Sequence, residues 1–473
     1  MKPKDPIKLG VPQGAALKEA IGAARRAAAK GIKKRELLAR VCAVLESPAD
    51  FADDEVFGAL SEALTAHPEA AAARTFQPRE SPAPYRIWGA GLEAGAIEQM
   101  NHACALPVST AGALMPDAHI GYGLPIGGVL ATENCVIPYA VGMDIACRMK
   151  MTVLDLPVSH IRGEEGRLRN ALERETEFGV GAGFSKRHEH AVMDADWSVS
   201  PVTKKHKDKA WFQLGSSGSG NHFVEFGTLT LEKPELGLAA GTYTALLSHS
   251  GSRGTGGEVA KYYSQRAMEL HPELPKHLKH LAWLALDSAC GQEYWQAMLL
   301  MGRYAAANHE LIHRAIAKNL GALVLADVEN HHNFAWKETH FGKEVIVHRK
   351  GATPATRETL GIIPGSMATP GFVVRGKGNA ESMNSASHGA GRAMSRTATK
   401  NCCSWSQAKR FLAEHDVVLI SAGLDEVPMG YKDIHEVMAA QTDLVDIIAR
   451  FDPKLVKMAP EEPTRRRRGS TKQ

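Results

Sequence analysis

The most restrictive feature of this chain is a change of composition at a proline-rich stretch. Residues 76–86 contain Pro78, Pro82 and Pro84, and such a stretch is typical of a linker. Residues 14–66, before it, are rich in alanine at helical spacing, whereas short apolar runs punctuated by glycine follow it. Because a fold must accommodate both patterns, we expect a small helical segment followed by a larger core of different architecture.

The N-terminal segment combines an apolar face with basic residues. Apolar residues recur at helical spacing from Leu17 to Leu45, and the pattern resumes over residues 53–66 after a break at Pro48. This spacing predicts two or three helices. The cations between Arg25 and Lys34 are compatible with contact to nucleic acid, although a solvated helix surface is the more common reason for such a run.

The core is predicted to belong to the α+β class. Apolar runs predict strands and tight turns over residues 114–119, 127–131, 136–141, 345–348 and 417–420. Helical spacing predicts helices over residues 161–179, 258–270 and 281–320. Because these elements do not alternate one for one, as a parallel βαβ array would, the order favours α+β.

Composition narrows the functional class. The hydrophobic share of 44% and the charged share of 23% are typical of a soluble globular protein, and no apolar run approaches the roughly 18 residues of a membrane helix. We therefore expect no membrane partner. Seven cysteines without CxxC spacing, and no apolar segment behind the first residues, indicate a reduced, cytoplasmic protein without a secretory signal.

The net charge of +4 allows an anionic partner without requiring one. Part of the positive charge lies in residues 460–473, where Arg465–Arg468 follow two prolines. We expect a disordered, solvated tail here rather than an arm that binds nucleic acid.

One histidine stands out as a candidate nucleophile. The stretch Ser385–Arg392 places His388 among small residues. Gly389 and Gly391 lack a Cβ, so the backbone can lie close to a ligand, and the guanidinium of Arg392 suits phosphate oxygens. A histidine held in this way can attack a phosphorus atom and carry the resulting group.

Potential metal ligands recur in turns rich in glycine, serine and asparagine. They are Asp144, Cys147, His222, His249 and the pair His331-His332. Their spacing matches neither a zinc finger nor HExxH, so spacing alone does not establish a metal site. One carboxylate, one thiolate and three imidazoles would nevertheless hold two divalent ions if the thiolate bridged them. Ligand softness points first to zinc, while the carboxylate leaves manganese open.

Anion-binding features accompany these ligands. They are the turn around Arg253, the stretch Arg349–Gly351 with Lys350, and Arg392 after Gly391, and guanidinium groups and turn N–H groups both suit phosphate. The chain has no GxxxxGK[ST] sequence, which excludes a P-loop NTPase. Residues 215–220 lack the GxGxxG order of a dinucleotide fold.

Taken together and in order, nine motifs resemble the RtcB family of GTP-dependent RNA-splicing ligases. They are Met115–His119 with Gly121–Gly123, Val141–Cys147, Gly220–Glu225, His249–Gly254, His331–Asn333, Arg349–Ala352, Pro364–Met367, Ser387–Arg392 and Tyr431–Ile434. Each motif is weak evidence by itself, but the ordered set is highly specific and covers roughly residues 84–457. The resemblance implies a core of mixed and antiparallel sheets surrounded by helices, to which the N-terminal helical segment is an addition.

The resemblance also implies an activity. Members join a 2′,3′-cyclic phosphate or 3′-phosphate RNA end to a 5′-hydroxyl end, in RNA repair or tRNA splicing, with GTP and two Mn²⁺ ions. His388 would become guanylylated, the GMP would pass to the RNA 3′-phosphate, and the 5′-hydroxyl would displace it. An activating protein is a further candidate partner.

Site residues follow from the resemblance, motif by motif. One ion would be held by Cys147, His249 and His332, and the other by Asp144, Cys147 and His222. The nucleotide would be bound by Asn221, Glu225, Ser366, Ala390, Gly391, Tyr431 and Lys457. Arg253, Arg392 and Lys350 would contact phosphate or RNA. Asp117 is a candidate further catalytic carboxylate.

Two positions depart from the family pattern, since Arg148 stands where members usually have glycine and Gly371 where they often have serine. The expected division is a helical appendage and linker over residues 1–80, a catalytic domain over 84–459 and a basic tail over 460–473. Two rival functions stay open: a metal-dependent phosphodiesterase or phosphatase on the same site, and a non-catalytic RNA-binding protein. The adjacent pair Cys402-Cys403 is expected to be buried packing.

Overall fold

The computed structural model describes residues 6, 9, 11, 15–65 and 76–461. The chain divides into two compact units. One contains residues 1–78 and 268–282, and the other contains residues 79–267 and 283–473. The basic tail predicted from the sequence lies outside the described residues from position 462 onward.

The N-terminal part of the first unit is helical, as the alanine-rich spacing predicts. Ala20, Ala23 and Ala27 follow one another at spacings of three and four residues, and all three are fully buried, so they line one face of a helix. That face packs on Val41 and Phe57. The elements are α2 (Ala15–Ala29), α3 (Lys34–Glu46), the 3-10 helix η1 (Pro48–Phe51) and α4 (Gly58–Thr65).

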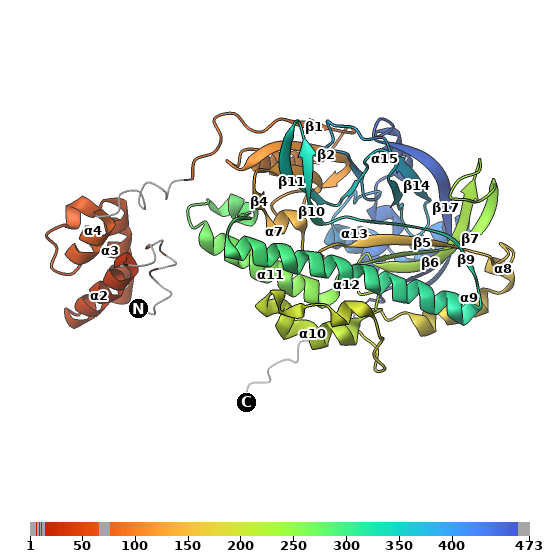
Figure 1. Cartoon of the computed structure of the whole chain (residues 1–473), viewed down its shortest axis with the longest axis horizontal. Helices are drawn as coiled ribbons and strands as arrows, with labels where there is room; N and C mark the ends of the chain where they lie inside the picture. The colour runs from red at the N-terminus through yellow and green to blue at the C-terminus, as the bar shows by residue number, and fades with distance from the viewer. Residues whose placement is uncertain (1–5, 7–8, 10, 12–14, 66–75, 462–473) are drawn as a thin grey trace. The chain divides into compact units, whose positions relative to one another are not determined.

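The rest of the described chain is a mixture of strands and helices (Figure 1). The strands are β1 (Tyr85–Ile87), β2 (Ser109–His119), β3 (Ile126–Thr132), β4 (Cys135–Val136), β5 (Arg148–Leu154), β6 (Phe223–Leu231), β7 (Gly241–Ser250), β8 (Leu284–Ala285), β9 (Val324–His331), β10 (Phe334–His340), β11 (Lys343–Lys350), β12 (Ala352–Pro354), β13 (Leu360–Ile363), β14 (Gly371–Gly376), β15 (Ser385–Ser387), β16 (Val418–Ser421) and β17 (Val445–Met458). The α-helices are α6 (Ala94–Cys104), α7 (Pro138–Val141), α8 (His160–Gly163), α9 (Glu165–Glu175), α10 (Pro201–Gln213), α11 (Arg253–Leu270), α12 (Ala289–Leu320), α13 (Arg396–Cys402), α14 (Trp405–Glu414) and α15 (Ile434–Ala439). The 3-10 helices are η2 (Ala191–Asp194), η3 (Trp197–Val199), η4 (Lys276–Leu281), η5 (Leu424–Glu426) and η6 (Pro428–Gly430).

Two largely antiparallel sheets form the core of the second unit. The larger has the order β13-β14-β17-β6-β7-β5-β9, with β16 added in parallel to β17. Its ends approach each other, because the side-chain amide of Asn330 on β9 donates to the Ile362 carbonyl and accepts from the Ile362 N–H on β13. The smaller sheet has the order β1-β2-β3-β11-β10. This architecture confirms the predicted α+β class.

Successive side chains along each strand of the larger sheet point alternately to its interior and to the helices that cover it. Leu247 on β7 packs with Met151 and Phe451 inside the curved sheet, whereas its neighbour Leu246 packs with Ile312 of α12. Successive strand residues face opposite sides, so the strands here are apolar on both faces. Figure 1 shows α12 running along this sheet as its longest covering element.

Most elements lie where the sequence predicts them, and four differ. The helix predicted over residues 161–179 is divided into α8 and α9 and ends at Glu175. Residues 136–141 are not one strand, because Pro138 begins α7 at a position where its missing N–H costs no hydrogen bond. Helix α12 begins at Ala289, where the Ser288 side chain accepts from the Gly291 N–H, and not at residue 281. The linker is shorter than predicted because Tyr85 already pairs with Gly112 in the sheet. Among the described helices, none has the length and apolarity to cross a bilayer.

Candidate active site

The backbone around His388 is held by contacts from distant segments. After β15 ends at Ser387, the Ala390 N–H donates to the Pro364 carbonyl at 2.9 Å and the Lys432 N–H donates to the Gly391 carbonyl at 3.0 Å. Gly391 has a φ of +72°, and a Cβ there would lie 2.1 Å from the Asp117 carbonyl oxygen. Only glycine fits this position, so the turn holds His388 in one place.

Asp117 orients the ring of His388. Its Oδ2 lies 2.6 Å from His388 Nδ1 and also accepts from the His388 backbone N–H at 3.2 Å. Asp117 is fully buried in the part of β2 where pairing with β3 is irregular. Lys432 Nζ fixes this segment by donating to the Pro116 and Ala118 carbonyls at 3.1 and 2.7 Å. A carboxylate accepts from Nδ1–H, which leaves the Nε2 lone pair free to act as a nucleophile.

Cys147, His249 and His332 form one candidate metal centre. Cys147 Sγ lies 3.0 Å from His249 Nε2, which lies 3.4 Å from His332 Nε2. His249 Nδ1 donates to the Asn221 carbonyl at 3.1 Å, so its Nε2 is an unprotonated acceptor. Burial and the charge of neighbouring histidines lower the pKa of His249 to about 3 and that of His332 well below its usual value. Neutral imidazoles converging on a thiol fit a divalent cation.

Asp144, Cys147 and His222 form an adjoining set that shares the thiol. His222 Nε2 lies 2.9 Å from Asp144 Oδ2 and 3.3 Å from Cys147 Sγ. Burial acts to raise the pKa of Asp144, but the hydrogen bond from His222 and the charges of His222 and Arg253 outweigh it and hold that pKa well below its usual value. Gly251 allows the close approach, since a Cβ there would lie 2.3 Å from both carboxylate oxygens.

Arg253 alters the second set. Its Nη2 lies 3.0 Å from His222 Nδ1, and a guanidinium can only donate. Nδ1 of His222 must therefore accept, which places the ring proton on Nε2, facing Asp144. An ion bound through Nε2 requires this proton to leave and the guanidinium to turn away. The first set thus fits a metal ion once the Cys147 thiol, which donates to the Ser250 carbonyl at 3.4 Å, loses its proton. The second set fits only after the further rearrangement around His222.

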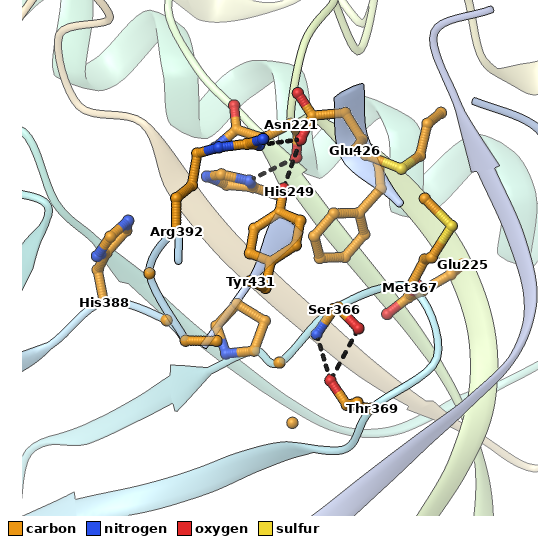
Figure 2. Close-up of a pocket in the computed structure, with 18 of the residues that line it drawn as sticks. Asn221, Glu225, His249, Ser366, Met367, Thr369, His388, Arg392, Glu426 and Tyr431 are labelled. Carbon is orange, nitrogen blue, oxygen red and sulfur yellow. Dashed lines mark hydrogen bonds and ion pairs between the residues drawn. The ribbon is translucent and has the colours of Figure 1, made fainter. Parts of the chain in front are cut away.

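A cavity opens beside His388 and is lined by most of the predicted nucleotide-binding residues (Figure 2). The predicted residues that line it are Asn221, Glu225, Ser366, His388, Ala390, Gly391, Arg392 and Tyr431. Apolar side chains of Phe223, Met367 and Val456 complete its walls. The ring of His332 lies 4.8 Å from that of His388, between centroids. The structure therefore brings the histidine, a metal centre and the cavity together.

Glu225 is an unpaired carboxyl group in this cavity. It is buried, and burial raises its pKa well above the usual value. It has no hydrogen-bond partner among the described residues. A buried carboxyl without a partner is costly, so the position favours a ligand that presents N–H donors.

Glu426 is a functional-site residue that the sequence analysis missed. Figure 2 shows its carboxylate between Arg392 and Tyr431. It accepts from the Tyr431 hydroxyl and from Arg392 Nη1 at 3.3 Å, and it pairs with Arg396 at 2.7 Å. Its one sequence signal is an acidic pair five residues before Tyr431, and such pairs are usually surface residues.

Arg392 is less free to hold phosphate than the sequence implied. Its Nε donates to the Met394 carbonyl at 3.0 Å, and its Nη2 donates to Thr399 Oγ1 at 3.0 Å and to the Asp425 carbonyl at 2.8 Å. The guanidinium also lies 5.2 Å from the centroid of the Tyr431 ring. Arg392 lines the cavity mainly as a cation fixed by protein groups.

Three of the predicted nucleotide, phosphate or RNA contacts do not line the cavity: Arg253, Lys350 and Lys457. Lys457 points to the opposite face of β17 from Val456, where its Nζ donates to the Leu172 and Thr176 carbonyls at 3.1 Å. Lys350 Nζ donates to the Tyr122 and Leu124 carbonyls, and burial lowers its pKa to about 7. As placed, both ammonium groups hold neighbouring backbone.

The two departures from the family pattern have different settings. The guanidinium of Arg148 lies against α12, where it donates to the Gly302 carbonyl at 3.2 Å, and it pairs with Glu329 at 3.6 Å. It follows Cys147 in the chain and uses these partners away from the metal-binding side chains. Gly371 lines the cavity, where a Cβ would lie 3.3 Å from Pro364 Cα, so a larger side chain would be tight.

A carboxylate-held histidine lies beside two adjoining sets of side chains that could hold metal ions and beside a cavity, an arrangement typical of enzymes that transfer a group through a histidine. A family model described as tRNA-splicing ligase RtcB matches residues 99–458. This chain therefore belongs to the RtcB family, as its motifs predict.

Individual relatives agree with the family match. The chain is 34% identical to the RNA-splicing ligase RtcB of Escherichia coli strain K12 over 397 residues, which cover 77% of this chain and 95% of that protein. It is 32% identical to the tRNA-splicing ligase RtcB of Nanoarchaeum equitans over 415 residues, which cover 72% of this chain and 87% of that protein. The tRNA-splicing ligase RtcB of Archaeoglobus fulgidus is 31% identical to this chain over 440 residues, which cover 76% of this chain and 88% of that protein.

Proposed function

We propose that this RNA ligase joins a 2′,3′-cyclic phosphate or 3′-phosphate RNA end to a 5′-hydroxyl end through a GMP–His388 intermediate. The observation that carries the proposal is the 2.6 Å contact between His388 Nδ1 and Asp117 Oδ2. It leaves Nε2 as the free nitrogen in the cavity, next to His332. Family membership and the names of the relatives support RNA ligation as the overall reaction.

The proposed chemistry has three transfers. Nε2 of His388 attacks the α-phosphorus of GTP, so a P–N bond forms, the bond to the bridging oxygen breaks and pyrophosphate leaves. An oxygen of the RNA 3′-phosphate then displaces Nε2 and takes the GMP. Finally the 5′-hydroxyl attacks the RNA phosphorus, loses its proton and expels GMP. A cyclic phosphate end must first be opened by water to a 3′-phosphate.

Asp117 supports the first and second transfers. As Nε2 forms its bond to phosphorus, positive charge develops on the imidazole ring. A fully buried carboxylate at Nδ1 stabilises that charge and keeps the ring in the reactive tautomer. When the GMP leaves, the same contact returns the ring to its starting state.

The two sets of metal-binding side chains would hold two Mn²⁺ ions. Cys147, His249 and His332 are the residues for one ion, and Asp144, Cys147 and His222 for the other. Bound there, divalent ions neutralise phosphate charge and orient the reacting oxygens. The carboxylate among the ligands and the family resemblance both favour manganese over zinc.

The cavity would bind the guanosine part of GTP. Glu225 is suited to accept from the N1–H and 2-amino groups of guanine, which adenine lacks in this arrangement, and the cavity's apolar walls suit a flat base. Asn221 and Ser366 supply further polar contacts. Arg253, which is bound to His222 in the absence of ligand, is the proposed phosphate contact.

Labelled GTP tests the proposal. With Mn²⁺ present, the protein should acquire an acid-labile GMP adduct, and His388→Ala should lose it while keeping the same melting temperature. RNA with defined 3′-phosphate and 5′-hydroxyl ends should then be joined. If no adduct forms, or if His388→Ala retains it, the ligase mechanism fails and a metal-dependent phosphodiesterase on the same site becomes the better explanation. RNA binding without turnover would point to a non-catalytic protein.

We also infer the setting of the reaction. The seven cysteines are free thiols in the structure, which fits a reducing, cytoplasmic compartment. An activating protein stays a proposed partner. Roles in RNA repair and in tRNA splicing would be distinguished by the RNA ends that the protein joins.

A further inference from the structure

Two adjacent cysteines lie at the surface, outside the nucleotide cavity. The sequence predicts buried packing for them, and this is wrong, because Cys402 is exposed and Cys403 is half-buried. Cys402 ends α13, and Cys403 caps it. The chain leaves α13 here and begins α14 at Trp405, so both thiols lie in the short connection between the two helices.

We propose that Met394, Cys402 and Cys403 form a binding site for a thiophilic monovalent ion, with Cu(I) as the best match. Cys402 Sγ lies 3.6 Å from Cys403 Sγ and 3.4 Å from Met394 Sδ. Metal–thiolate bonds of about 2.3 Å place three sulfur ligands up to about 4 Å apart around one ion. Both separations from Cys402 fall within this range, so Cys402 can share an ion with either neighbouring sulfur.

The chemistry of the donors selects the class of ion. Two thiolates and a thioether are soft ligands, which select Cu(I) and similar ions over hard ions such as Mn²⁺. The two Sγ atoms are not bonded, since a disulfide bond is about 2.05 Å long. The pair is therefore a dithiol that is available to a metal ion.

A surface cavity gives access to the two thiols of this cluster. Cys402, Cys403 and Met429 line it together with the ring of Phe411. Arg410 and Glu414 also line it, so polar groups of both signs surround an apolar, sulfur-rich floor. An ion can enter from solvent, unlike at Cys147, which is 3% exposed.

The cluster lies on a segment that contacts the nucleotide cavity. The carbonyl of Met394 accepts from Arg392 Nε, and Thr399 of α13 accepts from Arg392 Nη2, both at 3.0 Å. An ion that joins Met394 to Cys402 would close a loop around these two contacts. Binding at the three-sulfur cluster would thus stiffen the segment that holds Arg392.

Anaerobic titration of the full chain with Cu(I), in competition with a chromogenic Cu(I) chelator, tests the site. The titration is done on Cys147→Ser, because the buried thiol at the metal centre also attracts soft ions. One tightly bound Cu(I) per chain is expected. The bound ion should be lost on adding Cys402→Ser and Cys403→Ser, and excess Mn²⁺ should not displace it. Met394→Leu should weaken binding at least about tenfold, as even losses of outer partners do in metal sites.

A matched control is Cys290→Ser, which removes a half-buried thiol elsewhere on the chain and should leave the titration unchanged. A second measurement uses the Cys147→Ser chain with both surface thiols intact. One equivalent of Cu(I) should protect Cys402 and Cys403 from alkylation while Cys290 still reacts. The proposal is overturned if Cys147→Ser binds no Cu(I), if the cysteine replacements leave binding intact, or if both thiols react equally fast with and without Cu(I).

Discussion

At the scale of single residues, the site depends on pairs that are far apart in the chain. His388 and Asp117 are 271 positions apart and share a 2.6 Å contact. Cys147 lies close to both His222 and His249. Each partner limits what the other can do, because the carboxylate sets the tautomer of the imidazole and the thiol is shared by the two sets of possible metal ligands.

Asp117→Asn should slow adduct formation while leaving the fold intact. The amide can donate to Nδ1, which would place the ring proton on Nε2 and block its lone pair. The same substitution in the serine protease triad costs about 10⁴ in rate, so we expect a loss on the order of 10³–10⁴ in single-turnover guanylylation. Mn²⁺ affinity should stay unchanged. A rate near that of the wild type would remove Asp117 from the mechanism.

Glu225→Gln should lose discrimination for guanine. Hydrogen bonds to charged groups contribute about 1.5–3 kcal/mol, so adduct formation with GTP should fall by about 10- to 100-fold. Adduct formation with inosine triphosphate, which lacks the 2-amino group, should fall less in the same variant. The matched control is Glu426→Gln, whose carboxylate contacts Arg392 and Tyr431 and should affect both nucleotides alike. If Glu225→Gln reduces adduct formation equally with GTP and with inosine triphosphate, the assignment of Glu225 as the partner of the 2-amino group is contradicted.

At the scale of elements, strand alternation decides which residues enter the cavity. Glu225 on β6 is in register with Val456 on β17, and both line the cavity. Their neighbours Val224 and Lys457 are also paired and face the helical layer. A motif that identifies three consecutive residues therefore identifies at most two for the site, which explains the position of Lys457.

His348 on β11 links elements through one tautomer, and its titration should be visible in stability. Nε2 accepts from the Ile137 N–H at 2.9 Å, and Nδ1 donates to the Leu130 carbonyl at 3.1 Å. Burial lowers its pKa to about 4, against about 6.5 in the unfolded chain. Above pH 6.5 the His348 ring is neutral in both the folded and the unfolded state, and its full contribution to the free energy of unfolding is present. As pH falls from 6.5 to 4, the unfolded state binds the proton first and stability is lost.

The difference between those pKa values corresponds to about 3 kcal/mol. His348→Gln, measured by urea unfolding, should therefore destabilise the protein more at pH 7 than at pH 4.5, by about 2–3 kcal/mol. The comparison with the wild type at each pH cancels the titration of the other histidines. A destabilisation that is the same at both pH values would show that this ring does not titrate as described.

At the scale of the whole molecule, the cavity and both sets of metal-binding side chains lie within the family-matched region, residues 99–458. The N-terminal helices have their own apolar core. Nothing in the site comes from them.

Deleting residues 1–75 should therefore leave formation of the His388 adduct within about twofold of the full chain, because the N-terminal helices have their own apolar core and contribute none of the described site residues. The adduct is measured with labelled GTP and the fold is checked by circular dichroism. RNA ligation, measured in parallel, would reveal any contribution of the basic helices to substrate binding. Loss of the adduct in a folded deletion variant would contradict the predicted boundary.

The sequence by itself determined the class of fold and the family, and it predicted most of the residues that we assign to the site. Helical and strand spacing are local properties, so α11, β3 and β11 lie where the spacing predicts. The motifs around His388 and Cys147 likewise carry their chemistry within a few residues. These features can be predicted because hydrophobic periodicity and turn preferences act between near neighbours.

Only the tertiary structure decided which of these residues work together. It paired Asp117 with His388, placed Glu426 in the cavity, turned Lys457 away from it and exposed Cys402. None of these follows from spacing, because the direction of a side chain depends on the register of its strand and on partners hundreds of positions away. Such contacts arise from the packing of the folded chain as a whole.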